Sequence, residues 1–279
     1  MSKSYRLCII GNSHVAALKM AWSKTAFDVR DDFALSFFAV QKYMFRHIGL
    51  KDRALVPTQD DVAAELQFRS DGLDRVDIER YDAIAMVGSG FGVDMSYFRS
   101  LGGTPDYLGF THVDPLVSEA CFDAVLDNAF EDSPAITLID LIRSVSEIPI
   151  VMFPTPYLSE RVLESEVGKR DFHLADRTAL ARCVARARAA GERIAAKRNC
   201  TVIWQDDATV GVPGFTSSTF NRGSVLFNVP DGNPMRYDDR HGNEEFGRLA
   251  MNQVLGYLDA ISGGRVLAKG PERRESRSG

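Results

Sequence analysis

The sequence has few cysteines, no long apolar run and no excess of positive charge, and each absence excludes a class of protein. Its four cysteines are scattered without a CxxC pair, which argues against a disulfide framework and predicts reduced core thiols (Cys8, Cys121, Cys183 and Cys200). The first apolar run spans only about four residues, too few for a secretion signal, and no later run approaches the length of a membrane span. We therefore expect a cytoplasmic protein without membrane contacts.

The charge balance is slightly acidic and offers nucleic acid no electrostatic attraction. Thirty-three basic residues stand against 38 acidic ones, giving a formal net charge of -5. No cluster of His, Cys or Asp has the spacing of a metal site, and the acidic pairs at 206–207 and 238–239 are typical of turns. We expect no metal and no cofactor. The expected partner is a small molecule or a glycan ester, and the oligomeric state stays open.

The order of apolar segments predicts an α/β fold. Short buried-type strands are expected near 5–10, 34–40, 83–87, 149–153 and 201–204, and helical patterns near 15–22, 114–130, 134–147, 176–198 and 242–262. Alternation of this kind favours a mostly parallel central sheet flanked by helices. We expect one domain over 1–264, with a long active-site loop over 205–237. A small hairpin insertion is expected within 50–75, with its strands near 54–56 and 65–68. The charged tail, 265–279, is expected to be disordered.

The first strand ends abruptly in Gly11, Asn12, Ser13 and His14. A helical pattern follows, so Ser13 would lie at the carboxyl end of a strand, where open sheets place their ligands. A serine hydroxyl is a poor nucleophile unless a histidine takes its proton and a carboxylate orients that histidine. Asp238 and His241, near the other end of the chain, have the D-x-x-H spacing that lets one loop supply both groups.

Each of these residues also has a structural alternative. Ser13 could cap the first helix, and Asp238 with His241 could form an ordinary loop ion pair. Asp239 competes with Asp238 for the carboxylate role, but adjacent side chains tend to point apart, and Asp238 has the better spacing. His14, beside the serine, fits a packing or helix-start role better than a catalytic one.

The two motifs together resemble those of the SGNH hydrolases, a superfamily of GDSL-type esterases, lipases and carbohydrate acyl esterases. Its first block, G-[DN]-S, matches Gly11 to Ser13, and His14 matches a G-D-S-H variant. Its last block, D-x-x-H before a final helix, matches Asp238 and His241. The resemblance spans most of the chain, and it implies a flavodoxin-like three-layer fold with Ser13 as nucleophile, His241 as base and Asp238 as the orienting carboxylate.

The chain departs from the family pattern at the oxyanion hole. The family uses the nucleophile's N–H, a second-block glycine and a third-block asparagine, but after the strand at 83–87 this chain has Gly88, Ser89 and Gly90. Gly90 stands at the asparagine position. Loss of one such donor typically costs about 10²–10³ in rate. Asn12, Ser89 or backbone N–H groups of the glycine loop are the candidate substitutes.

Three further readings concern the surroundings of this site. The aromatic and basic segment 41–47 could line a substrate cleft beside Ser13, or it could be helix surface and core. Gly88-x-Gly90-x-Gly92 follows a strand, yet it lacks the spacing of a nucleotide-binding loop. Gly49 is a distant candidate for the second-block glycine.

The resemblance implies a serine esterase that hydrolyses small acyl esters through an acyl-enzyme. O-acetyl groups on carbohydrate are the expected substrate, because G-D-S-H-like members often act on polysaccharides. Two alternatives stay open: an O-acyltransferase that passes the acyl group to a sugar hydroxyl, and a catalytically silent domain that binds a glycan or a partner protein. The missing asparagine is the reason for the second alternative.

Overall fold

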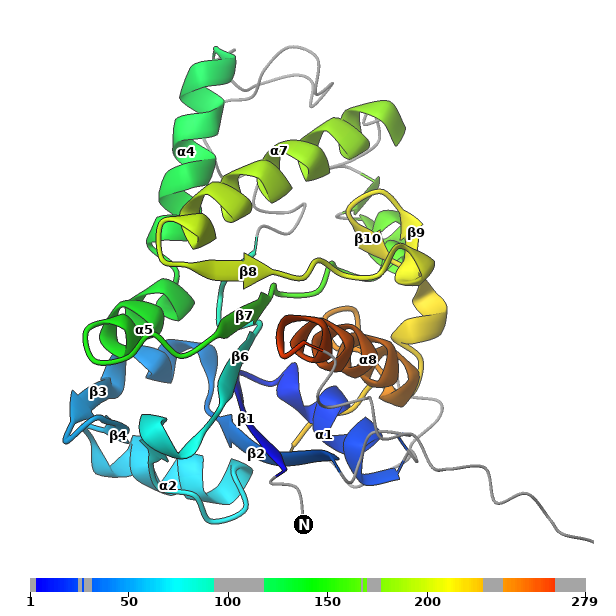
Figure 1. The fold of residues 1–279 in the computed structure, drawn as a ribbon. Helices are drawn as coiled ribbons and strands as arrows, with labels where there is room; N and C mark the ends of the chain where they lie inside the picture. The colour runs from blue at the N-terminus through cyan, green and yellow to red at the C-terminus, as the bar shows by residue number, and fades with distance from the viewer. Residues whose placement is uncertain are drawn as a thin grey trace, which may run out of the picture.

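A five-stranded parallel sheet forms the centre of the protein (Figure 1). The computed structural model describes residues 4–24, 27, 32–92, 118–166, 168–169, 177–227 and 238–263. The strands are β1 (Tyr5–Gly11), β2 (Phe33–Ala39), β6 (Ala83–Val87), β7 (Ile150–Phe153) and β8 (Cys200–Val202). Their spatial order is β2-β1-β6-β7-β8, which is the 2-1-3-4-5 order of flavodoxin-like folds. The predicted α/β class is confirmed.

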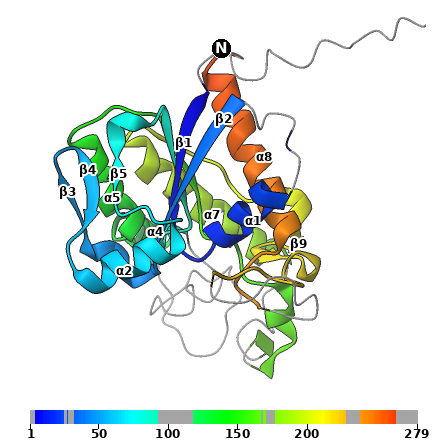
Figure 2. The same ribbon diagram turned by 90° about the horizontal axis from the view of Figure 1, so that it is seen from below.

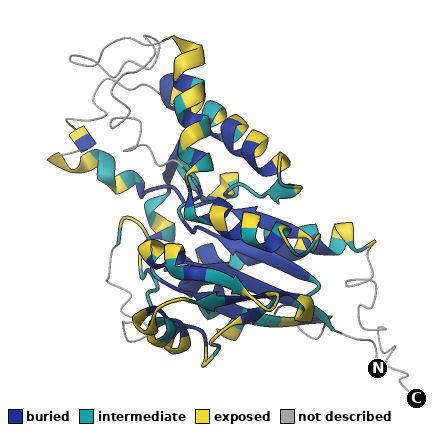
Figure 3. Cartoon of the chain, turned by 90° about the vertical axis from the view of Figure 1, so that its left-hand side faces the viewer, coloured by how far each residue is buried: buried dark blue, intermediate teal, exposed yellow. Residues whose placement is uncertain are grey.

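Helices cover both faces of this sheet and make a three-layer structure. On one face lie α1 (Val15–Lys24) and α8 (Glu244–Ile261), and on the other lie α2 (Asp60–Arg69), α4 (Glu119–Glu131), α5 (Pro134–Arg143) and α7 (Arg177–Ala196) (Figures 1 and 2). Successive side chains of β1 point to opposite faces of the sheet and so pack against both helical layers. Leu7 and Ile9 pack with α1 and α8, whereas Cys8 and Ile10 pack with the opposite layer. The sheet is buried and the outward turns of the helices are exposed (Figure 3).

The insertion between the second and third strands of the sheet is a small antiparallel unit. After the 3₁₀ helix η2 (Lys42–His47), β3 (Ile48–Lys51) pairs with β4 (Ala54–Pro57), and β4 pairs with β5 (Val76–Asp77). The sequence interpretation placed one hairpin strand at Glu65–Phe68, which is wrong because these residues belong to α2. The sequence contained a helical pattern here, since Val62, Leu66 and Arg69, the buried residues of α2, stand at helical spacing.

The segment expected to be an irregular loop over 205–237 contains ordered elements. They are η6 (Asp207–Thr209), β9 (Val210–Val212), β10 (Phe215–Thr216) and η7 (Ser218–Phe220), and β9 pairs with β10 in an antiparallel hairpin. A further 3₁₀ helix, η5 (Glu160–Glu164), follows β7, and η3 (Ile78–Arg80) precedes β6. Residues 228–237 and the charged tail 265–279 lie outside the described residues.

The long helices lie near their predicted positions with different bounds. The helix expected over 134–147 ends at Arg143, and the one expected over 114–130 begins at Glu119 after its N-cap Ser118, whose Oγ accepts from Cys121 N; positions 114–117 lie outside the described residues. Cys121 is exposed on α4, so the expectation of four core thiols is wrong for this residue.

Within the described ranges, no helix is both long and apolar enough to cross a membrane. In the same part of the chain, no three His, Cys, Asp or Glu side chains gather as a metal-binding group.

Candidate active site

The turn that carries Ser13 is fixed by close packing at the carboxyl edge of the sheet. Gly11 pairs with Ala39 of β2 and Val87 of β6, so the ends of three strands meet here. A Cβ at Gly11 would lie 2.3 Å from the Val87 carbonyl oxygen, which excludes any larger residue. The chain then turns into α1 as Val15 N donates to Asn12 O at 3.0 Å. Ser13 therefore lies at the meeting point of three strand ends.

The structure brings Ser13, His241 and Asp238 together in one line of contacts. Ser13 Oγ lies 2.7 Å from His241 Nε2, although 228 positions separate the two residues. His241 Nδ1 lies 3.0 Å from Asp238 Oδ2, at ion-pair distance, but the carboxylate approaches off the direction of a linear hydrogen bond. The Ser13 hydroxyl thus points to the imidazole, and no described backbone N–H donates to it as a helix cap would require.

The loop that carries His241 is held by hydrogen bonds from three directions. Asn221 Nδ2 donates to His241 O at 3.0 Å, and Ser159 N donates to Asp239 O at 2.8 Å. Directly after the loop, Asn243 caps α8, because its Oδ1 accepts from Phe246 N at 3.0 Å. These contacts fix both ends of the loop and therefore the imidazole.

Asp238 is held in its ionised form. Burial raises the pKa of its carboxyl, but the backbone N–H of Arg240 and the charge and N–H groups of His241 outweigh burial and leave the pKa below its usual range. Asp238 Oδ1 accepts from Arg240 N at 2.8 Å and from His241 N at 3.2 Å. The carboxylate therefore shapes the loop with one oxygen and faces the imidazole with the other. Asp239, the competing carboxylate, is exposed.

His14 packs beneath the candidate base. Its ring centroid lies 5.1 Å from that of His241, with the two planes tilted by 32°. Burial, then the charge of His241, lower the pKa of His14 to about 3; Arg240 and Lys42 add to this, while Asp238 opposes it. His14 is therefore neutral near pH 7, and its buried Nδ1 has no hydrogen-bond partner among the described groups. This placement fits a packing role.

The four predicted oxyanion or substrate-binding residues occupy one cluster, but most of their polar groups are already engaged. Asn12 Oδ1 accepts from His14 N at 3.2 Å, and Gly88 N donates to Phe153 O at 2.8 Å. Ser89 is fully buried and its hydroxyl donates to Val87 O at 3.2 Å. These contacts build the loop, but in the described part of the chain they leave the Nδ2 amide of Asn12 without a partner.

Backbone donors beside Ser13 stay unengaged. Within the described ranges, the N–H groups of Ser13 and Gly90 donate to no other group. No described side-chain amide stands where the family's asparagine would be, because Gly90 has no side chain. The neighbouring side chain is Lys42, which belongs to the segment 41–47 that was expected either to line a substrate cleft or to form helix surface and core. The sequence feature that could have pointed to Lys42 is its position three residues after the end of β2.

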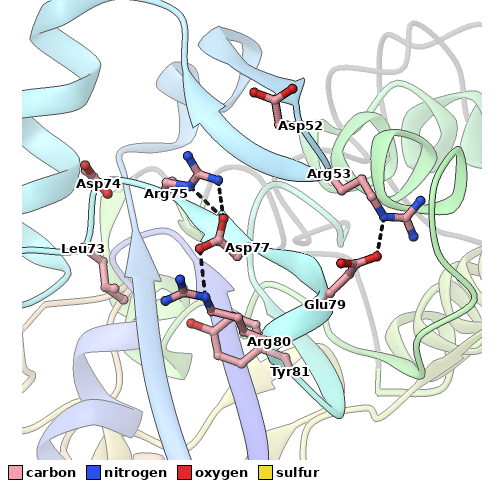
Figure 4. A pocket seen from close by; sticks show the side chains of 9 residues that line it. All are labelled: Asp52, Arg53, Leu73, Asp74, Arg75, Asp77, Glu79, Arg80 and Tyr81. Atoms are coloured by element: carbon pink, nitrogen blue, oxygen red, sulfur yellow. Dashed lines mark hydrogen bonds and ion pairs between the residues drawn. The ribbon is translucent and has the colours of Figure 1, made fainter.

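A separate pocket of about 580 Å³ lies towards the amino-terminal ends of the central strands, away from Ser13 (Figure 4). It is lined by the β3–β4 turn and by the chain leading into β6 at Tyr81. Its arginines pair with its own carboxylates: Arg80 with Asp77 at 3.1 Å, Arg53 with Glu79 at 2.6 Å, and Arg75 with Asp77 as well. Because Ser13 lies at the carboxyl-terminal ends of the central strands, this pocket is not part of its site.

Comparison with known proteins identifies no family. No protein-family model and no curated protein sequence matches the chain. Among solved structures, a DUF4886 family protein from Bacteroides uniformis has a TM-score of 0.40 and 12% identity, with 99% of this chain and 89% of that chain covered. The lipopolysaccharide acetyltransferase periplasmic domain of Salmonella ser. Paratyphi A has a TM-score of 0.45 and 12% identity, covering 92% and 85%. A gut microbial diltiazem-metabolizing enzyme has a TM-score of 0.40 and 10% identity, covering 92% and 47%. These similarities are too distant to carry an argument about function.

Proposed function

We propose that this protein is a serine esterase that hydrolyses small acyl esters, with O-acetyl groups on carbohydrate as the expected substrate. The observation that carries the proposal is the 2.7 Å contact between Ser13 Oγ and His241 Nε2, with Asp238 behind the imidazole. A nucleophile, a base and an orienting carboxylate at such distances are the recurring constellation of acyl transfer. The preference for acetylated carbohydrate rests on the sequence resemblance alone.

Each group has a distinct chemical task in this proposal. Ser13 Oγ attacks the ester carbonyl while His241 Nε2 takes its proton, and His241 then gives that proton to the departing alcohol. Asp238 stabilises the imidazolium through Nδ1. Water, activated by the same imidazole, then hydrolyses the acyl-enzyme. If a sugar hydroxyl replaces water in this last step, the enzyme is an acyltransferase.

The test is turnover of p-nitrophenyl acetate together with labelling by a fluorophosphonate. We expect Ser13→Ala to lose about 10⁶-fold in kcat and all labelling, since members of a catalytic triad act as a unit. Ser23→Ala is the matched control: Ser23 lies at the far end of α1, where its Oγ donates to Met20 O at 2.8 Å, and both readouts should be unchanged.

Absence of both turnover and labelling in the wild-type protein would contradict the esterase and favour a silent binding domain. Product analysis with added acceptor sugars would separate hydrolysis from transfer, because only a transferase yields acylated sugar.

A further inference from the structure

The loop after β6 has an unusual backbone that packs against the residues around Ser13. Gly88, Ser89 and Gly90 all have positive φ values, of 66°, 51° and 75°. Ala135 N at the start of α5 donates to Ser89 O at 3.1 Å, and Phe91 N closes the turn on Gly88 O at 2.8 Å. A Cβ at Gly88 would lie 2.6 Å from Asn12 Oδ1. The loop is thus fixed directly beside the residues that flank the nucleophile.

The side chain of Lys42 covers the third residue of this loop. A Cβ on Gly90 would lie 2.8 Å from Lys42 Cε and 3.6 Å from its Nζ. The end of the lysine, not its stem, therefore borders the space into which a side chain at position 90 would extend, together with Pro134 Cδ at 3.0 Å. The third-block asparagine of the SGNH pattern would extend into this space.

The sheet register explains why two segments so far apart in sequence meet here. The last residues of β2, β1 and β6 are aligned across the sheet: Ala39, Gly11 and Val87. The chain therefore leaves all three strands at the same, carboxyl-terminal end of the sheet. Lys42 and Gly90 each come three residues after this aligned row, and Ser13 comes two residues after it. The 3₁₀ helix that begins with Lys42 also packs against α5, which holds the Gly90 loop.

The ammonium group of Lys42 is available to a ligand. Lys42 is exposed, and in the described part of the chain no carboxylate lies within ion-pair distance of it. Its charge reaches the site, because it contributes to the lowered pKa of His14. A cation beside the Gly90 loop that has no carboxylate partner among the described residues is suited to hold developing negative charge.

From this geometry we propose that Lys42 is a catalytic residue that supplies the oxyanion donor in place of the missing side-chain amide, an inference that rests on the proposed esterase function. As the bond from Ser13 Oγ to the carbonyl carbon forms, the carbonyl π pair moves onto oxygen and the serine proton goes to His241. Lys42 Nζ donates a hydrogen bond to that oxygen without transferring its proton, together with the N–H of Ser13. When the carbonyl re-forms, the alkoxide leaves with the proton from His241.

The test compares Lys42→Met with Lys51→Met on p-nitrophenyl acetate. Methionine keeps an apolar stem over Gly90 and removes the charge, so we expect kcat to fall about 10²–10³-fold with little change in KM, because the contact forms in the transition state. Lys51, an exposed residue at the end of β3, undergoes the same chemical change and should keep wild-type kinetics. Thermal unfolding of both variants checks that they fold.

A donor exchange distinguishes catalysis from a structural role. The double variant Lys42→Ala with Gly90→Asn removes the lysine end and places an amide in its space, and asparagine tolerates positive φ better than most residues. We expect the double variant to recover at least tenfold of the kcat lost in Lys42→Ala alone. Gly90→Asn alone should gain nothing, because its Cβ meets Lys42.

The outcomes separate the two proposals. If wild type shows Ser13-dependent turnover and Lys42→Met retains its kcat, the role of Lys42 is wrong while the esterase stands. The same holds if the exchange restores nothing in a double variant whose thermal unfolding matches that of wild type. If wild type shows no Ser13-dependent turnover, both proposals fail.

Discussion

At the scale of single residues, the candidate site contains two adjacent carboxylates with different surroundings. Asp238 faces the imidazole with one oxygen and closes the loop with the other, whereas the Asp239 side chain is exposed and contributes its backbone carbonyl. The two residues therefore form a matched pair for testing which carboxylate orients His241.

We expect Asp238→Asn to lower kcat by about 10⁴-fold, because an amide N–H facing Nδ1 favours the wrong imidazole tautomer. Asn retains the acceptor oxygen that Arg240 N uses, so the loop should keep its shape. Asp239→Asn serves as control and should remain within about twofold of wild type. Kinetics with p-nitrophenyl acetate measure both variants, and equal losses at 238 and 239 would rule out a specific role for Asp238.

At the scale of elements, the distance between Ser13 and His241 depends on how closely α1 and α8 pack. Gly247 makes this approach possible, because a Cβ there would lie 2.1 Å from Ala17 O and 2.4 Å from Ala17 C. Both atoms belong to the backbone, so no rotamer change relieves the clash. Ser13 lies just before α1 and His241 just before α8, so a displacement of one helix moves one partner.

We expect Gly247→Ala to reduce the free energy of unfolding by about 1–3 kcal/mol through overpacking and to lower kcat as well. Gly256, in the same helix, has no atom near its Cβ position, so Gly256→Ala should be neutral or stabilise by up to about 1 kcal/mol. Urea unfolding and esterase assays on both variants provide the check. Unchanged stability and turnover in Gly247→Ala would mean that α8 adjusts without disturbing the site.

Among the elements, some could be predicted from the sequence and others could not. Strands of the parallel sheet are short continuous apolar runs, and Ser13 and His241 stand next to clear strand and helix signals, so these were predictable. The position of Lys42 beside Gly90 was not predictable, because it arises only when β2 and β6 end at the same end of the folded sheet. The β9–β10 hairpin lies in a stretch rich in Gly, Pro, Asn and Asp, where local pattern favours loop over strand.

At the scale of the whole molecule, burial of a neutral histidine makes the folding equilibrium depend on pH. Unfolded His14 takes up a proton near its usual pKa of 6.5, whereas in the folded protein burial and the charge of His241 lower its pKa to about 3. Between these values the unfolded state binds more protons. His14 therefore adds stability above about pH 6.5, and that contribution is lost as pH falls towards 3.

We expect the difference in unfolding free energy between His14→Phe and wild type to change by up to about 1.4 kcal/mol per pH unit between pH 6.5 and 4, in favour of the variant at low pH. Phenylalanine keeps a planar ring against His241 and removes the buried Nδ1. Urea unfolding at several pH values measures the difference. Parallel curves for the two proteins would show that His14 accepts a proton in the folded state.

The separation of 228 positions between Ser13 and His241 also affects biosynthesis. A ribosome releases the strand that leads to Ser13 first and the loop that carries His241 late, so for most of translation the nascent chain contains Ser13 without His241. α8, which is made after that loop, also supplies the apolar side chains that cover Leu7 and Ile9 of β1. Chains released before α8 is complete would therefore lack a finished core, and those that stop before His241 would lack the base as well. On the proposed mechanism, esterase activity would then require that synthesis has passed α8.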